Sequence, residues 1–117
     1  MGDRQAAHQR GHAGESLAAW WLRLKGWRIL AVRARTPVGE VDLVARRGRT
    51  LAFIEVKARA TEAGAALALD DYRLRRVVRA AEALLPRYMR DGDTVRIDAM
   101  LLTPWRLPNH LVDVFRS

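Results

Sequence analysis

The sequence predicts an α/β fold in which helices flank a mixed β-sheet. Two segments of the chain carry apolar residues at helical spacing, and five others are short apolar runs typical of strands. Glycines and prolines separate many of these segments. The predicted order is α-β-β-β-α-β-β, and a chain of 117 residues has room for one domain.

The first predicted helix covers residues 14–25. Leu17, Trp21 and Leu24 recur at helical spacing, and Ala18 and Leu22 widen this apolar stripe, so we expect these residues to lie on the face that packs against the core. Gly26 follows at the position where a glycine commonly ends a helix.

The remaining elements follow from similar signals. Two strands meet at Gly48 and Arg49, and a two-residue loop that begins with glycine is typical of a type II′ hairpin turn. A second helix is expected from Asp70 to about Leu85, where Pro86 kinks or ends it. The predicted strands cover residues 27–35, 40–47, 50–59, 94–103 and 110–115.

Composition limits the class of protein. The chain has no cysteine, which excludes disulfides and thiolate metal sites and fits a cytoplasmic protein. Its longest apolar run, LAAWWL, is far too short to cross a membrane. Residues 1–13 are polar and show no periodicity, so we expect them to be disordered and the folded domain to cover residues 14–117.

The chain is strongly basic, with a formal net charge of +8. Lysine and arginine attract phosphate backbones by releasing counterions, so this charge favours a nucleic-acid partner. Codon bias towards alanine and arginine would produce the same composition without selection for binding. Charge alone therefore leaves both interpretations open.

The predicted hairpin gathers charged residues at its open end. With its turn at residues 48 and 49, Asp42 faces Glu55 and Glu40 faces Lys57. The opposite face of the hairpin is apolar and is expected to lie in the core. That apolar face places Val41, Leu43 and Ala45 opposite Val56, Ile54 and Ala52.

Opposed carboxylates repel each other unless something neutralises them. At Asp42 and Glu55 the neutralising group would be a proton, Lys57 or a divalent cation. A divalent cation fits here because Mg²⁺ and Mn²⁺ prefer oxygen ligands. Only two of the 21 basic residues are lysines, and the compact ammonium of Lys57 suits contact with a phosphate or an attacking water. The alternative is a solvated strand end with an ordinary Glu40–Lys57 ion pair.

These residues resemble the site of the PD-(D/E)XK nuclease superfamily, in which an acidic residue after a turn leads through a hairpin to Glu-x-Lys. The segments GESLAAWWLRLKGWRIL, VGEVDLVARRG, LAFIEVKAR and VRIDAM are more closely similar to the YraN-like family of small bacterial proteins. That family is itself similar to Holliday-junction resolvases. The likeness runs from about Gly14 to Leu101. The combination of GE-x-DL with F-x-EVK-x-R is specific, whereas E-x-K alone is weak.

The resemblance implies a restriction-endonuclease-like core and roles for the matching residues. Two carboxylates would bind Mg²⁺ or Mn²⁺, and a lysine would act beside them. The carbonyl of Val56 and the carboxylate of Glu15 match further metal ligands, although a helix N-terminus would also stabilise an acid at Glu15. Glu40 matches a position next to the site, as a supporting residue or the partner of the lysine. The matching catalytic residues are Asp42, Glu55 and Lys57.

Two positions depart from the family pattern. Val41 replaces the proline of the superfamily's Pro-Asp pair. Arg73 stands where the family tends to have lysine, and arginine keeps a phosphate contact more easily than a role in proton transfer. Arg76 and Arg79 follow at three-residue spacing, where they would track a phosphate backbone unless they form a solvated helix face. With Arg59 they complete the predicted nucleic-acid-binding set.

Three further features have weaker signals. Trp105 lies in a basic loop and is the best base-stacking candidate among the four tryptophans. Val112 and Val114 on the last predicted strand would let a second copy pair, so a homodimer is expected by analogy with resolvases. Arg96 and Asp98 match a family strand motif without an evident function.

Together these features predict a metal-dependent endonuclease that hydrolyses phosphodiester bonds in DNA, with branched or flapped DNA as its substrate. The intact Asp42, Glu55 and Lys57 favour this interpretation. The alternatives are a non-catalytic nucleic-acid-binding module on the same scaffold and a protein-interaction adaptor with an acidic partner. Metal dependence separates the enzyme from the module, and steep salt dependence identifies nucleic-acid binding.

Overall fold

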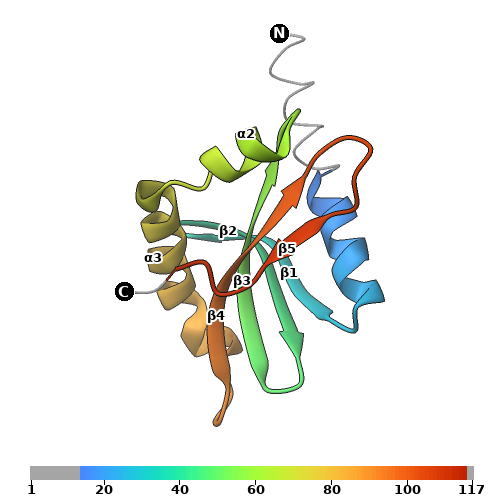
Figure 1. Ribbon diagram of the computed structural model, residues 1–117. Helices are drawn as coiled ribbons and strands as arrows, with labels where there is room; N and C mark the ends of the chain where they lie inside the picture. Colours follow the sequence, from blue (N-terminus) through green and yellow to red (C-terminus); the bar gives the residue numbers. More distant parts are fainter. Residues whose placement is uncertain (1–13, 116–117) are drawn as a thin grey trace, which may run out of the picture.

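The computed structural model describes residues 14–115, which form a five-stranded sheet with helices packed against it (Figure 1). The strand order is β1-β2-β3-β4-β5; β3 and β4 run parallel, and the other neighbours are antiparallel. A helix over residues 14–24 precedes β1 and is called the first helix below. The elements after it are β1 (Arg28–Thr36), β2 (Gly39–Arg47), β3 (Thr50–Ala58), α2 (Glu62–Leu67), α3 (Asp71–Tyr88), β4 (Thr94–Leu102) and β5 (Asn109–Leu111). The predicted mixed α/β fold is confirmed, whereas the expected disorder of residues 1–13 concerns a segment outside the described residues.

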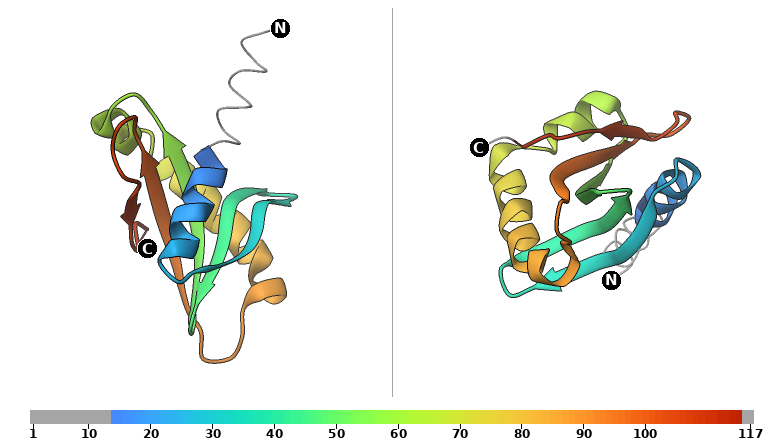
Figure 2. Two further views of the ribbon diagram at one scale, coloured as in Figure 1. Left: turned by 90° about the vertical axis from the view of Figure 1, so that its right-hand side faces the viewer. Right: turned by 90° about the horizontal axis from the view of Figure 1, so that it is seen from below.

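The first helix and α3 cover opposite faces of the sheet (Figure 2). The first helix packs Ala18 and Leu22 against a cluster that includes Ile54. On the other face, α3 packs Leu74 against a cluster that includes Phe53. Because the sheet is buried on both sides, its central strands are apolar on both faces. The parallel β3–β4 pair is joined by a crossover through α2 and α3, as parallel neighbours require.

The β2–β3 hairpin has the predicted register from its turn to the pair formed by Leu43 and Ile54. Gly48 has a φ of +60°, while Arg49 does not enter the left-handed region. This combination fits a type II′ turn, which needs a positive φ at its first central residue only. The turn chemistry therefore sets the register of the two strands that carry most of the candidate site.

The first helix buries only one side of the predicted apolar stripe. Ala18 and Leu22 are fully buried, whereas Leu17 and Leu24 are 46% and 60% exposed. Small side chains allow the helix to lie close to the sheet, and Gly14 packs against the ends of β3 and β4. All positions of the stripe are apolar in the sequence, so helical spacing alone could not identify which of them are buried.

Two predictions about the following helices were incomplete. The α3 helix does not end at Pro86 but continues to Tyr88. A proline in the last turn removes only one backbone donor, so the helix tolerates it there. The short helix α2 was not predicted, because its sequence EAGAAL has no apolar stripe; Thr61 caps it by accepting a hydrogen bond from the Gly64 N–H at 3.0 Å.

The alternation of faces is broken near the start of β2. Val41 packs in the cluster on the α3 side, together with Val44, whereas Leu43 packs in the cluster below the first helix. The prediction that Val41 and Leu43 share one face was therefore wrong. The strand changes its orientation at the intervening residue, Asp42.

The last strand is shorter than predicted. Because β5 ends at Leu111, Val112 and Val114 lie outside the sheet. The Val114 N–H donates a hydrogen bond to the Ile97 carbonyl at 2.8 Å, and its side chain packs on the α3 side of the core. Val114 is therefore not an exposed strand residue that could pair with a second copy.

Candidate functional site

The candidate site lies at the open end of the hairpin, where β2 and β3 separate. Regular pairing stops at Leu43 and Ile54, so the predicted pair of Asp42 opposite Glu55 is not part of the ladder. Instead, Asp42 Oδ2 accepts a hydrogen bond from the Val56 N–H at 2.7 Å. A side chain thus replaces the backbone acceptor that a continued ladder would supply. Asp42 is held in the gap that opens between the two strands.

Glu55 and Lys57 form an ion pair inside this gap. Lys57 Nζ lies 2.7 Å from Glu55 Oε1, and the two side chains are only 14% and 12% exposed. They project from the same face of β3 because they are two residues apart in a strand. Glu40 pairs instead with Arg35 at 3.3 Å, on the solvent-exposed side of the site. The solvated Glu40–Lys57 pair that the sequence allowed is therefore not formed.

The electrostatic environment of Asp42 disfavours its ionised form. Burial, followed by the negative charge of Glu55, raises the pKa of Asp42 to about 7. Glu15 also raises this pKa, while the hydrogen bond from Val56 and the charge of Lys57 lower it. The site therefore holds more negative charge than Lys57 alone can balance.

Glu15 approaches this cluster from the first helix. Its Oε2 atom lies 3.2 Å from Arg33 Nε, yet this buried oxygen accepts no hydrogen bond within the described residues. Burial raises the pKa of Glu15, Arg33 lowers it, and Glu40 and Glu55 raise it. Arg33 has a φ of +50° within β1, an unusual backbone conformation that no feature of the sequence indicated. This conformation places the Arg33 side chain beside Glu15, a contact that was not predicted from the sequence.

The acidic residues fit a divalent cation in their chemistry, although they are not gathered into a complete metal cluster. No three Asp, Glu, His or Cys side chains among residues 14–115 are grouped so that they could hold an ion. The candidate ligands are oxygens, and the raised pKa of Asp42 is a condition that a cation would relieve. Asp42 and Glu55 would hold such an ion, and the Val56 carbonyl and Glu15 remain predicted additional ligands.

Two hollows meet at Asp42, Glu55 and Lys57, which line both of them. The first, here called the helix-side hollow, has a volume of about 890 Å³ and lies between the first helix and the ends of β3 and β4. The second, the α3-side hollow, measures about 580 Å³ and lies between the open hairpin and the start of α3. Because both are lined by Glu55 and Lys57, both lie near the end of β3 from which the chain leads to α2.

Three of the four predicted nucleic-acid-binding arginines lie around these hollows. Arg73 and Arg76 line the α3-side hollow, and Arg59 lines the helix-side hollow. Arg79 lines neither. Tyr72, which sequence reasoning missed, lines the α3-side hollow and is 72% exposed. Its one signal in the sequence was its position directly before Arg73.

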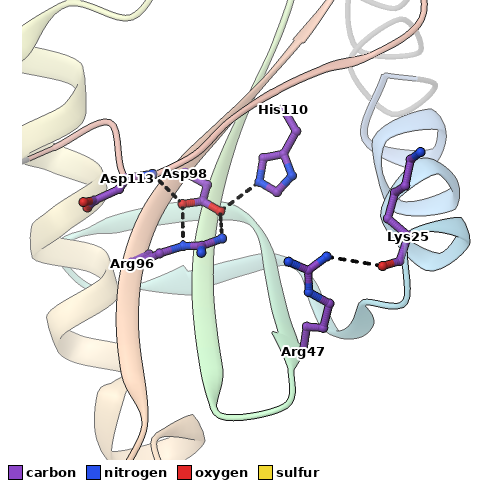
Figure 3. Close-up of polar contacts among 6 residues, drawn as sticks. All are labelled: Lys25, Arg47, Arg96, Asp98, His110 and Asp113. Carbon is purple, nitrogen blue, oxygen red and sulfur yellow. Dashed lines mark hydrogen bonds and ion pairs between the residues drawn. The ribbon is translucent and has the colours of Figure 1, made fainter.

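A second charged cluster joins β4 to β5 and to the segment after β5 (Figure 3). The buried Asp98 carboxylate accepts hydrogen bonds from Arg96 at 3.2 and 2.9 Å and from the Asp113 N–H at 2.9 Å. His110 Nε2 lies 2.8 Å from Asp98 Oδ2. Burial alone would raise the pKa of Asp98, but the hydrogen bonds from His110, Arg96 and Asp113 bring it below its usual value. The Arg96–Asp98 motif thus has a structural role.

The tryptophans differ in their access to a ligand. Trp27 is buried, and the guanidinium groups of Arg47 and Arg96 lie over its ring, 4.7 and 5.5 Å from the centroid. Arg47 also donates to the Lys25 carbonyl at 3.4 Å (Figure 3). Trp105 is fully exposed, so it remains the tryptophan best placed to stack on a base.

The fold and the site define a small mixed α/β protein with a buried carboxylate–lysine cluster open on two sides. Residues 14–102 match the model of a family described as "Uncharacterised protein family UPF0102". A relative called "UPF0102 protein" from Rhizorhabdus wittichii is 62% identical over 117 residues, which cover 100% of this chain and 99% of the relative. One of the same name from Sphingopyxis alaskensis is 64% identical over 113 residues, 97% of each chain. The chain belongs to the UPF0102 family, which confirms the predicted resemblance to YraN-like proteins.

No helix in the part of the chain that the structure describes is both long enough and apolar enough to span a membrane.

Proposed function

We propose that this protein is a metal-dependent endonuclease that hydrolyses phosphodiester bonds in DNA, with branched or flapped DNA as its substrate. The observation that carries the proposal is the buried Glu55–Lys57 pair beside Asp42, at the meeting point of two open hollows. Titratable groups with a perturbed pKa in an open hollow are typical of functional sites. The resemblance to nucleases concerns the same three residues.

Each side chain of the cluster has its own proposed role. Asp42 and Glu55 would hold Mg²⁺ or Mn²⁺, which when bound activates water and neutralises phosphate charge. Lys57 stabilises the negative charge that develops on the phosphate, because its ammonium group is already inside the site and shielded from water. Glu55 holds that ammonium in place.

The arrangement of the hollows supports cleavage within a strand. Both hollows are lined by the central cluster, so a DNA strand can cross the site from one hollow to the other without a free end. Arg73 and Arg76 on one side and Arg59 on the other would contact phosphates without reading the sequence. A homodimer would present two such sites to a branched DNA, and the lack of cysteine favours a cytoplasmic enzyme.

A cleavage assay with matched variants tests the proposal. Labelled single strand, duplex, flap and four-way junction are incubated with Mg²⁺, Mn²⁺ or EDTA. We expect metal-dependent cutting that falls by about a hundredfold or more in Lys57→Ala and Glu55→Gln, as when a group that stabilises transition-state charge is removed. The matched controls are Lys25→Ala and Glu82→Gln, two exposed residues that line neither hollow. These should cut as the wild type does.

The alternatives give different results in the same assay. DNA binding without cutting, unchanged in Lys57→Ala and Glu55→Gln, would identify a non-catalytic nucleic-acid-binding module. Absence of both binding and cutting would contradict any nucleic-acid function and leave the adaptor with an acidic partner.

A further inference from the structure

The walls of the helix-side hollow are more apolar than a phosphate-binding site requires. Leu17 comes from the first helix, Val56 and Ala58 from β3, and Leu102 and Pro104 from the end of β4 and the following loop. Leu17 is 46% exposed at this wall, although Ala18 next to it is fully buried. Apolar surface that lines an open hollow is typical of a place that a ligand covers.

Charge is divided between the two hollows. The α3-side hollow carries Arg73 and Arg76, which suit phosphates. Its wall also contains Glu40 and Asp70, which form ion pairs with Arg35 and Arg73. The helix-side hollow shares Asp42, Glu55 and Lys57 with the α3-side hollow and also contains Glu15. The rest of its wall is mainly apolar, with Arg59 and Thr103 as the other polar groups. A ligand that enters both hollows should therefore be anionic on one side and apolar on the other. A nucleotide has this character, because its phosphate is charged and the faces of its base are apolar.

The helix-side hollow is also continuous with the reacting centre. Asp42, Glu55 and Lys57 line it, so its occupant must be attached to, or lie next to, the phosphate at Lys57. Its volume of about 890 Å³ lies within the size range of pockets that hold small molecules. A base of the substrate strand next to this phosphate meets the first condition and is small enough to fit within this volume.

We propose that the helix-side hollow binds a single unstacked nucleobase, that of a nucleotide adjacent to the scissile phosphate. This inference rests on the proposed nuclease function and specifies which part of the substrate the site recognises. A base within a duplex is covered on both faces by its neighbours, so only an unpaired or flipped base can contact the walls of the hollow. The substrate class is thus DNA with unpaired nucleotides next to the cleaved bond.

Recognition of this kind should be insensitive to base identity. The wall residues Leu17, Val56 and Leu102 contact the flat faces that all bases share, rather than their hydrogen-bonding edges. The protein should therefore distinguish unpaired from paired nucleotides more strongly than one sequence from another.

The test compares two fluorescein-labelled duplexes with single-stranded flaps of equal length, one natural and one composed of abasic nucleotides. Both flaps carry the same phosphate charge, so a difference in affinity reports contacts with the bases. Fluorescence anisotropy in EDTA measures binding independently of metal and cleavage. We expect the full-length protein to bind the natural flap about tenfold more tightly, as base–side-chain contacts permit. Equal affinities for the two flaps would overturn the inference.

A pair of matched variants locates the contact. Leu17→Gln places a polar side chain in the wall of the hollow, whereas Leu24→Gln makes the same change on the same helix at a residue that lines neither hollow. Both leucines are already largely exposed, so both variants should fold. The preference for the natural flap should fall towards one in Leu17→Gln and persist in Leu24→Gln. An equal effect in both variants, or none in either, would show that the base does not enter this hollow.

Cleavage of the same two DNAs separates this inference from the proposed function. If Mg²⁺ supports equal cutting of the natural and abasic flaps, the protein is a nuclease and the base-binding inference is wrong. If base-dependent binding occurs without cutting in Mg²⁺ or Mn²⁺, the proposed nuclease function is wrong and the base-binding inference is supported. Absence of binding to either flap would overturn both.

Discussion

Asp42 is subject to two opposing electrostatic influences. The hydrogen bond from the Val56 N–H favours the ionised carboxylate, whereas burial and the charge of Glu55 favour the protonated form. Burial and Glu55 have the larger effect, since the pKa of Asp42 rises to about 7. Ionisation of Asp42 therefore lowers the stability of the folded protein, and this loss is what a bound cation would offset.

This argument predicts that Asp42→Asn stabilises the metal-free protein at alkaline pH. The Asp42 carboxyl has an ordinary pKa of 3.8 when unfolded and about 7 when folded. Between these values the folded state binds more protons, so wild-type stability falls as pH rises through this window and remains lower above it. Asparagine keeps an acceptor for the Val56 N–H without the charge. The free energy of unfolding, measured with urea in EDTA, should be about 1–3 kcal/mol higher in the variant near pH 8.

The difference should disappear near pH 4, where Asp42 is protonated in the folded state and half protonated in the unfolded chain. Asp91→Asn changes an exposed aspartate and serves as the control, which should not alter stability at either pH. A variant of Asp42 that is less stable than the wild type near pH 8 would contradict the argument. Mg²⁺ should stabilise the wild type more than Asp42→Asn, because only the wild type retains this ligand.

At the scale of secondary-structure elements, β4 and β5 depend on a buried charge for their connection. Asp98 lies in the middle of β4, and it is contacted by Arg96 of the same strand, by His110 of β5 and by the Asp113 N–H beyond it. Because β5 has only three residues, its backbone pairing is limited. Side-chain contacts to Asp98 therefore supply much of what fixes β5 and the segment after it.

Asp98→Asn should destabilise the protein at neutral pH. Although burial raises the pKa of Asp98, its hydrogen bonds lower it below 3.8, so the ionised group contributes stability that is present above the unfolded pKa and lost as pH falls through the folded value. Removing the charge leaves Arg96 and His110 without their anionic partner, at a cost of about 3 kcal/mol. Urea unfolding at neutral and acidic pH measures this. The loss should shrink under acidic conditions, and a loss of equal size throughout would point to packing rather than charge.

The helices and strands differ in how well they could be predicted from the sequence. The hairpin register follows from local information, because Gly48 sets the turn and strand alternation places the residues as far as the pair of Leu43 and Ile54. The choice of which helix residues are buried does not follow from local information. Leu17 and Leu22 are equally apolar, and only contact with the sheet decides which of them is buried. The Asp98–His110 contact also lay beyond prediction, since it depends on how β5 returns along β4.

The contacts of the candidate site likewise include some that could be predicted from the sequence and others that could not. Its central residues could be predicted, because Glu55 and Lys57 are neighbours on one face of a strand and the hairpin brings Asp42 close to them. The contact between Glu15 and Arg33 could not, because it joins a helix to a strand through an unusual backbone conformation. Periodicity and turn signals describe single elements, whereas such contacts depend on how elements pack.

For the whole molecule, the question is whether its net charge of +8 acts diffusely or through particular arginines. A diffuse field attracts any polyanion and depends only on total charge. Arginines that contact phosphates directly release a counterion at each phosphate, and this makes affinity fall linearly with salt concentration on logarithmic axes. The exposed arginines of α3 allow the two effects to be separated, because some line the α3-side hollow and others do not.

The double variant Arg73→Gln/Arg76→Gln removes two charges from the hollow, and Arg75→Gln/Arg79→Gln removes two from exposed positions outside it on the same helix. Net charge falls equally in both, so a diffuse field would weaken their binding to flapped DNA by the same amount. Direct binding to phosphates predicts that only the first variant lowers the slope of log affinity against log salt, by about 0.7–0.9 for each phosphate that it no longer neutralises. Anisotropy titrations over a series of salt concentrations measure the slopes. Equal slopes in the two variants would place the DNA backbone away from the α3-side hollow. Such a result would also contradict the proposed path of a DNA strand from one hollow to the other across the candidate site.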